Sequence, residues 1–148
     1  MGKQAGKVIT IQWELLVIAG QDVGILIPHL FAMGNPIHMT IGTARGGIDA
    51  IASDSPLFVG RPGSYGDRAS HFAIQQCDCL LILGCRLSGS TTGYYPQRFG
   101  QNAYKIMVDI DQKELEKPDV PIERKLYMDV KLCLERLSGP TPRKRSFI

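Results

Sequence analysis

Residues 79–111 read CLLILGCRLSGSTTGYYPQRFGQNAYKIMVDID, and this stretch decides the fold. It holds two short apolar runs, Leu80–Leu83 and Ile106–Val108, which are typical of buried strands. The first run ends in Gly84, where a backbone can approach a ligand closely. The second ends in the segment Asp109–Asp111, whose carboxylates can accept hydrogen bonds from a ribose or an adenine. Ligands of open α/β sheets bind beyond the carboxyl ends of the strands, so this stretch predicts a parallel sheet with a nucleotide-shaped crevice.

The composition is that of an ordinary globular protein. A chain of 148 residues, 44% hydrophobic and 21% charged, is most simply one domain with a substantial core. No apolar run approaches the roughly 18–20 residues that a membrane helix needs. The first 20 residues lack the apolar core of a signal peptide, because Gln12 and Glu14 interrupt it. We therefore expect a cytoplasmic protein without a membrane partner.

The positive charge is small and lies partly at the end of the chain. The formal net charge is +3, and the segment 142–148 contains Arg143, Lys144 and Arg145. Three charges without an aromatic platform are few for binding nucleic acid, so we expect a solvated tail and no nucleic-acid partner.

Cysteine and histidine positions argue against a metal site. Cys77 and Cys79 have the wrong spacing for a C-x-x-C pair, and Cys85 and Cys133 do not complete a second one. Free, mostly buried thiols in a reducing compartment are the better interpretation. The three histidines are dispersed and are assigned no catalytic role; they are His29, His38 and His71.

Apolar runs alternate with helical stretches along the chain. The expected strands are Glu14–Gly20, Pro36–Thr40, Pro56–Gly60, Leu80–Leu83 and Lys105–Asp109. The expected helical segments are Gly24–Met33, a single turn in Ile48–Asp54, a helix from Asp67 to about Gln76, Lys113–Glu116, and Lys131–Leu137. Asp67 is expected to cap the third of these, in which Ala69, Phe72 and Ala73 share one face. Continuous apolar strands imply helices on both faces, which predicts an α/β fold with a Rossmann-like, doubly wound parallel sheet.

Three motifs follow one another in the second half of the chain. They are Gly63-x-x-Gly66-x-Arg68-Ala69, then Cys77-Asp78-x-Leu80-Leu81-x-Leu83-Gly84-x-Arg86-Leu87, then Ala103-x-Lys105-Ile106-x-x-Asp109-Ile110-Asp111. In this combination, and with the turn Asp54–Gly60, the chain resembles the central domain of thiamine-diphosphate-dependent enzymes, particularly the acetolactate synthase-like group. That domain is a DHS-like NAD/FAD-binding fold.

The resemblance implies a division of labour between domains. Full-length members of the family have three domains and bind thiamine diphosphate and Mg²⁺ between the first and the third. The first domain supplies the catalytic glutamate, and the third supplies a Gly-Asp-Gly…Asn motif. Nothing in this chain matches either, so we expect no catalytic residue, no metal site and no lyase or transferase activity from the chain alone.

The resemblance also supplies a candidate cofactor site. In acetolactate synthases the central domain binds FAD without a redox role in the main reaction, and some relatives bind ADP or nothing. Carried over residue by residue, Gly63, Ser64, Tyr65 and Gly66 flank the flavin, Gly84 and Arg86 lie beside the diphosphate, and Asp109, Ile110 and Asp129 surround the adenosine. Gly20, which closes the first expected strand, completes the set.

The chain departs from the FAD-binding pattern after Arg86-Leu87. FAD-binding members continue with Asp-Asp-Arg, whereas this chain has Ser88–Ser90 and so lacks side chains that help to hold FAD. Each candidate also has a purely structural alternative: a turn for the glycines, a surface salt bridge for Arg86, and a helix cap for Asp111.

Other polar residues could contribute to the crevice. Arg45 and Arg61 adjoin glycine loops and would add positive potential, although solvated loop arginines are the alternative. The loop 88–92 is rich in hydroxyl groups that can donate to phosphate. It lacks a Gly-x-Ser-x-Gly elbow, which argues against a hydrolase.

These observations predict one central domain over residues 1–140 and a basic tail over 141–148. Its expected role is structural and FAD- or ADP-binding, with the missing thiamine-diphosphate-binding domains or a second copy (a homodimer) as partner. Two alternatives stay open: a stand-alone nucleotide-binding module, and a non-functional remnant.

Overall fold

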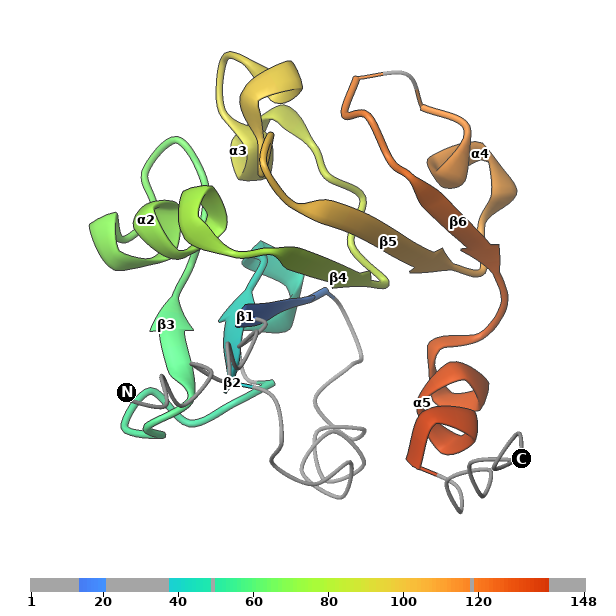
Figure 1. Cartoon of the computed structure of the whole chain (residues 1–148), viewed down its shortest axis with the longest axis horizontal. Helices are drawn as coiled ribbons and strands as arrows, with labels where there is room; N and C mark the ends of the chain where they lie inside the picture. Colours follow the sequence, from blue (N-terminus) through green and yellow to red (C-terminus); the bar gives the residue numbers. More distant parts are fainter. Residues whose placement is uncertain (1–13, 21–37, 49, 118, 139–148) are drawn as a thin grey trace, which may run out of the picture.

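A six-stranded sheet forms the centre of the molecule (Figure 1). The structure is a computed structural model and describes residues 14–20, 38–48, 50–117 and 119–138. All strand pairs are parallel, in the order β3-β2-β1-β4-β5-β6. The strands are β1 (Glu14–Ala19), β2 (His38–Thr43), β3 (Phe58–Gly60), β4 (Cys79–Leu83), β5 (Tyr104–Asp109) and β6 (Arg124–Tyr127). This is the strand order of doubly wound dinucleotide-binding sheets, and it confirms the predicted fold class.

Helices cover both faces of the sheet. In Figure 1, α2, α3 and α4 lie on one side of the strands and α5 lies on the other. The described helical segments are η2 (Arg45–Gly47), α2 (Arg68–Gln76), α3 (Gly89–Thr92), η3 (Pro96–Arg98), α4 (Gln112–Leu115) and α5 (Val130–Ser138).

Alternation along the central strands divides the core in two. Leu80 and Ile82 of β4 pack in one cluster with Ile74 of α2 and Leu115 of α4. Leu81 and Leu83 of β4 pack in a second cluster with Leu134 of α5. Successive side chains of a strand point to opposite faces, so one continuous apolar run supplies both layers. Each fully buried aliphatic side chain contributes about 1.5–3 kcal/mol, which makes these central strands the main source of stability.

Helix α2 has the predicted bounds but buries a different face. Ser70 and Ile74 are buried, whereas Phe72 is 68% exposed. The predicted face of Ala69, Phe72 and Ala73 is therefore wrong. Ile74 is the residue that enters the core between the helix and β4, and this contact sets the rotation of the helix.

The predicted side-chain cap of α2 is also wrong. Asp67 occupies the N-cap position but makes no capping hydrogen bond. Its Oδ2 instead accepts from the backbone N–H of Arg61 at 2.8 Å, and the Asp67 N–H donates to the Arg61 carbonyl at 2.9 Å. The turn at Gly60, with φ of 111°, brings these two segments together.

Several shorter elements differ from the expectations, and one of them is α3, which occupies Gly89–Thr92 where a loop was expected. Strand β2 continues to Thr43 because Gly42 and Thr43 pair with the end of β1, where a loop was expected. The helical turn after it is η2 (Arg45–Gly47), and the described residues of 48–54 form none. Strand β6 was not predicted because it is an exposed, charged edge strand without an apolar run.

Two of the expected segments are not among the residues that the structure describes. The helix expected at Gly24–Met33 and the basic tail 141–148 lie outside the described residues.

The cysteine prediction is confirmed: all four thiols are free, and Cys77, Cys85 and Cys133 are buried. In the described part of the chain, none of the helices is both long and apolar enough to span a bilayer.

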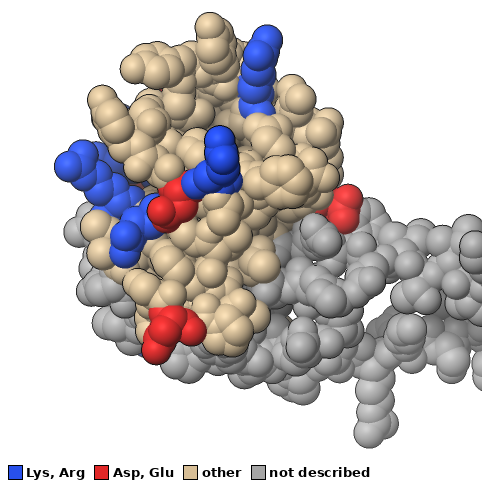
Figure 2. Space-filling view, turned by 90° about the vertical axis from the view of Figure 1, so that its left-hand side faces the viewer, with Lys and Arg blue, Asp and Glu red and all other residues tan. Residues whose placement is uncertain are grey.

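Aromatic side chains are exposed beside α2. Phe72 lies on the helix, and Tyr94 and Tyr95 are 89% and 66% exposed in the segment next to it. A small hollow lined by His71 and both tyrosines joins the two elements. Figure 2 shows this side of the molecule, on which much of the described surface is uncharged.

Candidate functional site

The order of the strands reverses between β1 and β4, and a crevice opens at their carboxyl ends. Gly20 follows β1 and donates its N–H to the carbonyl of Leu83 at 2.9 Å. Gly84 follows β4 in a left-handed conformation, with φ of 56°. A Cβ atom on Gly20 would lie 2.0 Å from the carbonyl oxygen of Gly84. The two glycines therefore pack backbone against backbone and form the floor of the crevice.

A first cavity of about 420 Å³ lies above this floor. Three of the candidate residues, Gly20, Gly84 and Arg86, line it, and so does Arg45, which follows β2. Residues of the 84–91 segment form the remaining wall.

A second cavity of about 400 Å³ adjoins the first. Gly63, Tyr65 and Gly66 line it, together with Arg61. Arg45, Ser90 and Thr91 line both cavities, so the two form one elongated crevice. Each volume falls within the roughly 300–1,000 Å³ of small-molecule sites.

Close packing holds the loop at residues 63–66 against the segment after β4. The Ser64 N–H donates to the carbonyl of Ser90 at 3.1 Å. A Cβ atom on Gly63 would lie 2.2 Å from the same carbonyl oxygen, so only glycine fits there. His71 Nε2 lies 2.7 Å from the Gly63 carbonyl oxygen and fixes the loop from α2. The predicted glycine turn is thus a rigid wall of the second cavity.

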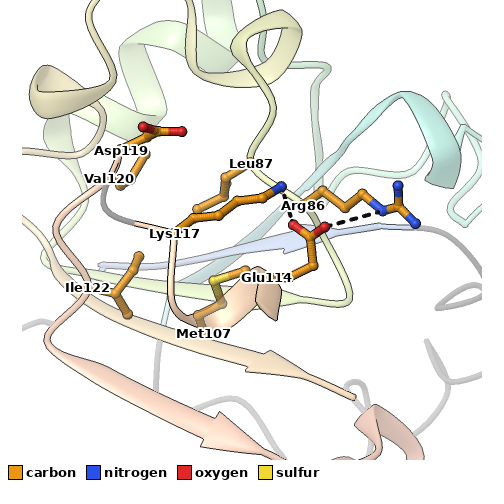
Figure 3. A pocket seen from close by; sticks show the side chains of 8 residues that line it. All are labelled: Arg86, Leu87, Met107, Glu114, Lys117, Asp119, Val120 and Ile122. Carbon is orange, nitrogen blue, oxygen red and sulfur yellow. Dashed lines mark ion pairs between the residues drawn. The ribbon is translucent and has the colours of Figure 1, made fainter. Parts of the chain in front are cut away.

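The structure shows for Arg86 the surface salt bridge that was considered as its structural alternative. Its side chain is 79% exposed and its Nε lies 3.9 Å from Oε1 of Glu114, whose other carboxylate oxygen pairs with Lys117. Figure 3 shows this chain of charges beside a small pocket, with the two terminal nitrogens of Arg86 pointing away from Glu114. Leu87 next to it is buried and has φ of 49°, a backbone conformation uncommon outside glycine. Arg86 is therefore oriented from one side and open to a ligand from the other.

Three predicted adenosine contacts lie away from the two cavities. Asp109 is buried, and its Oδ1 accepts from the N–H of Asp111 at 2.8 Å. Asp129 accepts from the N–H of Lys131 at 2.7 Å, at the start of α5. Ile110 is exposed. The residues that line the two cavities do not include any of the three.

The crevice is basic. Arg45, Arg61 and Arg86 line it, and among the described residues that line either cavity there is no Asp or Glu. Cys85 also lines the first cavity, but burial raises the pKa of its thiol and keeps it protonated near neutral pH. Within the described ranges, no three His, Cys, Asp or Glu residues are grouped to hold a metal ion. The arrangement suits binding of an anion better than nucleophilic or metal-assisted chemistry.

The sequence did not show that Arg45, Ser90 and Thr91 belong together. The sequence offers Arg45 as added positive potential or as a solvated loop arginine, and the hydroxyl groups of residues 88–92 as general donors to phosphate. The three residues line one crevice because Arg45 follows β2, Ser90 and Thr91 follow β4, and the strand order places β2 and β4 on either side of β1. No local sequence pattern reveals this relationship.

A parallel sheet in this order defines a doubly wound, Rossmann-like α/β domain. The chain belongs to the family "Thiamine pyrophosphate enzyme, central domain", whose model matches residues 4–137. This finding confirms the resemblance seen in the sequence.

Curated relatives agree with this assignment. The chain is 31% identical over 125 residues to a probable acetolactate synthase large subunit from Methanocaldococcus jannaschii, a match that covers 81% of this chain and 21% of that protein. It is 29% identical over 117 residues to the acetolactate synthase isozyme 2 large subunit of Escherichia coli, covering 78% and 21%. A probable large subunit from Methanococcus aeolicus is 28% identical over 139 residues, covering 91% and 22%. The chain thus spans about a fifth of the length of these relatives.

Proposed function

We propose that this acetolactate synthase-like central domain binds FAD or ADP in the crevice at the carboxyl edge of its sheet. The observation that carries the proposal is the pair of adjoining cavities, whose described lining residues include three arginines and no Asp or Glu. A nucleotide diphosphate supplies the negative charge that such a crevice favours.

The geometry of the first cavity suits the diphosphate. The planar fork of Arg86 pairs well with phosphate oxygens, and its terminal nitrogens point away from Glu114. Ser90 and Thr91 line the same cavity and add hydroxyl groups to it. The glycine floor lets the ligand approach the backbone closely.

The role in catalysis is indirect under this proposal. The chain would act within a thiamine-diphosphate-dependent enzyme of the acetolactate synthase type, in which other domains hold the thiamine diphosphate and Mg²⁺. The match of this chain to only about a fifth of the length of acetolactate synthase large subunits supports this division.

The exposed aromatic surface beside α2 supports a partner. We propose that Phe72, Tyr94 and Tyr95 contact the thiamine-diphosphate-binding domains of the same enzyme. A homodimer of this chain through the same surface is the competing arrangement. Sedimentation equilibrium of the wild type and of the Phe72→Ser/Tyr94→Ser variant separates the two, because only a homodimer gives a mass that halves on substitution.

Calorimetric titration with FAD, ADP and NAD tests the binding proposal. We expect measurable affinity for ADP or FAD and a loss of about tenfold in Arg86→Ala, since a charge-assisted hydrogen bond contributes ~1.5–3 kcal/mol. Arg98→Ala is the matched control, because Arg98 lies over the Tyr95 ring, outside both cavities. No heat with any of the three ligands, or equal losses in both variants, would refute the proposal.

A further inference from the structure

The second cavity carries more positive charge than its surroundings balance. Arg45 and Arg61 both line it, and neither forms an ion pair with any residue that the structure describes. Arg86, at the other end of the crevice, differs because Glu114 balances part of its charge. The uncompensated charge is therefore concentrated away from the proposed diphosphate contact.

Arg61 is held in place while its charge stays unbalanced. Its guanidinium carbon lies 5.9 Å from the centre of the Phe58 ring. Its Nε is buried and has no hydrogen-bond partner among the described residues. Asp67 is close in space, but its Oδ2 accepts from the backbone N–H of Arg61. A half-buried cation without a counterion is costly, and an anionic ligand group would remove that cost.

The remaining wall of the second cavity is largely apolar. Ile48, Pro62 and Tyr65 line it beside the two arginines. Arg45 lies between the cavities and can serve both. One ligand can thus place a diphosphate near Arg86 and a second charged group near Arg61, with apolar contacts between.

We propose that the natural ligand is a nucleotide with a second anionic group remote from its diphosphate, such as a phosphate monoester, and that Arg61 binds that group. The inference rests on the nucleotide-binding function proposed above and specifies the ligand class of the same crevice.

Matched nucleotide pairs test the inference, because each pair differs by a single phosphate monoester. The probes are NADP with NAD, and coenzyme A with dephospho-coenzyme A, titrated calorimetrically at low salt. We expect the phosphorylated member of at least one pair to bind about tenfold more tightly, which corresponds to about 1.4 kcal/mol. Arg61→Met should remove this preference, so that the two members of the pair bind with equal affinity.

Two controls make the outcome decisive. Arg61→Lys keeps the charge and should retain part of the preference, and Arg98→Met should retain all of it. If ADP binds but the wild type does not discriminate within either pair, the inference is overturned and the nucleotide-binding function stands. If Arg61→Met unfolds by circular dichroism, Arg61→Gln takes its place, and an unchanged preference in that variant also overturns the inference. If neither ADP nor FAD binds, the nucleotide-binding function itself fails.

Discussion

The buried ammonium group of Lys105 lies 3.5 Å from Oε1 of Glu123, and Oε2 of the same glutamate accepts a hydrogen bond from the Lys105 backbone N–H at 2.8 Å. The ammonium group also donates to the carbonyls of Gly100 and Ala103, at 3.0 and 3.1 Å. Lys105 is only 3% exposed, so its ammonium group makes these contacts away from solvent. The arrangement fastens the start of β5 to the segment that leads into β6, and so holds the edge of the sheet.

Replacing Lys105 with methionine should destabilise the fold. The substitution keeps the aliphatic stem but removes the ammonium donor from the carbonyls of Gly100 and Ala103 and from Oε1 of Glu123. We expect the free energy of unfolding to fall by about 2 kcal/mol, in the range for unsatisfied buried groups. Urea denaturation followed by circular dichroism measures this change. Lys125→Met, on the exposed side of β6, is the control and should change the midpoint little; equal midpoints for the two variants would show that the buried contacts do not stabilise the edge.

Adding a methyl group at Gly20 should damage the floor of the crevice. A Cβ there would lie 2.0 Å from the Gly84 carbonyl oxygen, so the backbone must move. We expect Gly20→Ala to lose about 1–3 kcal/mol of stability, the usual cost of overpacking. Gly89→Ala is the matched control, because a Cβ at Gly89 meets nothing within 4 Å. Thermal melts that show Gly20→Ala as stable as Gly89→Ala would contradict the close packing of the two strand ends.

Stability should fall at alkaline pH because of Cys77. Burial raises the pKa of its thiol from 9.0 to about 11. Between these values the folded state holds a proton that the unfolded state has lost, so the contribution is complete below pH 9 and disappears as the pH rises toward 11. We expect a loss of roughly 1 kcal/mol by pH 10 from this residue.

The alkaline loss is measured by urea unfolding at intervals between pH 7.5 and 10.5. Cys77→Ala should show a shallower decline than the wild type over this interval. The decline will not vanish, because burial also raises the pKa of Cys85 and Cys133. Parallel curves for the wild type and the variant would mean that the Cys77 thiol ionises as easily in the folded state as in the unfolded state.

The elements that depend on short-range pattern were predictable. The apolar run Leu80–Leu83 is a buried strand, and Asp111 caps α4 by accepting from the N–H of Lys113 at 2.9 Å. The orientation of α2 was not predictable from its own spacing, because the contact of Ile74 with the core decides it. Strand β6 gave no signal because pairing with β5, and not burial, defines it.

Some residues of the candidate site could be predicted from the sequence, and others could not. The resemblance supplied Gly84 and Arg86, and the structure brings both to one cavity. Arg45 joins them only through the order of strands around the switch point, which is a long-range property. The resemblance also supplied Asp109, but this residue does not line either cavity. Its carboxylate accepts a hydrogen bond from the backbone N–H of Asp111 at the end of β5.

Localised binding of ADP is the most direct test of the central claim that the crevice is a nucleotide site. The measurement is a ¹H–¹⁵N NMR titration of the chain with ADP, with backbone amides as reporters. The account predicts saturable shifts at Gly84, Ser64 and Thr91, little change at Lys131 in α5, and weaker binding in Arg86→Ala. Shifts confined to α5 and β6, or no shifts with millimolar ADP, would contradict it.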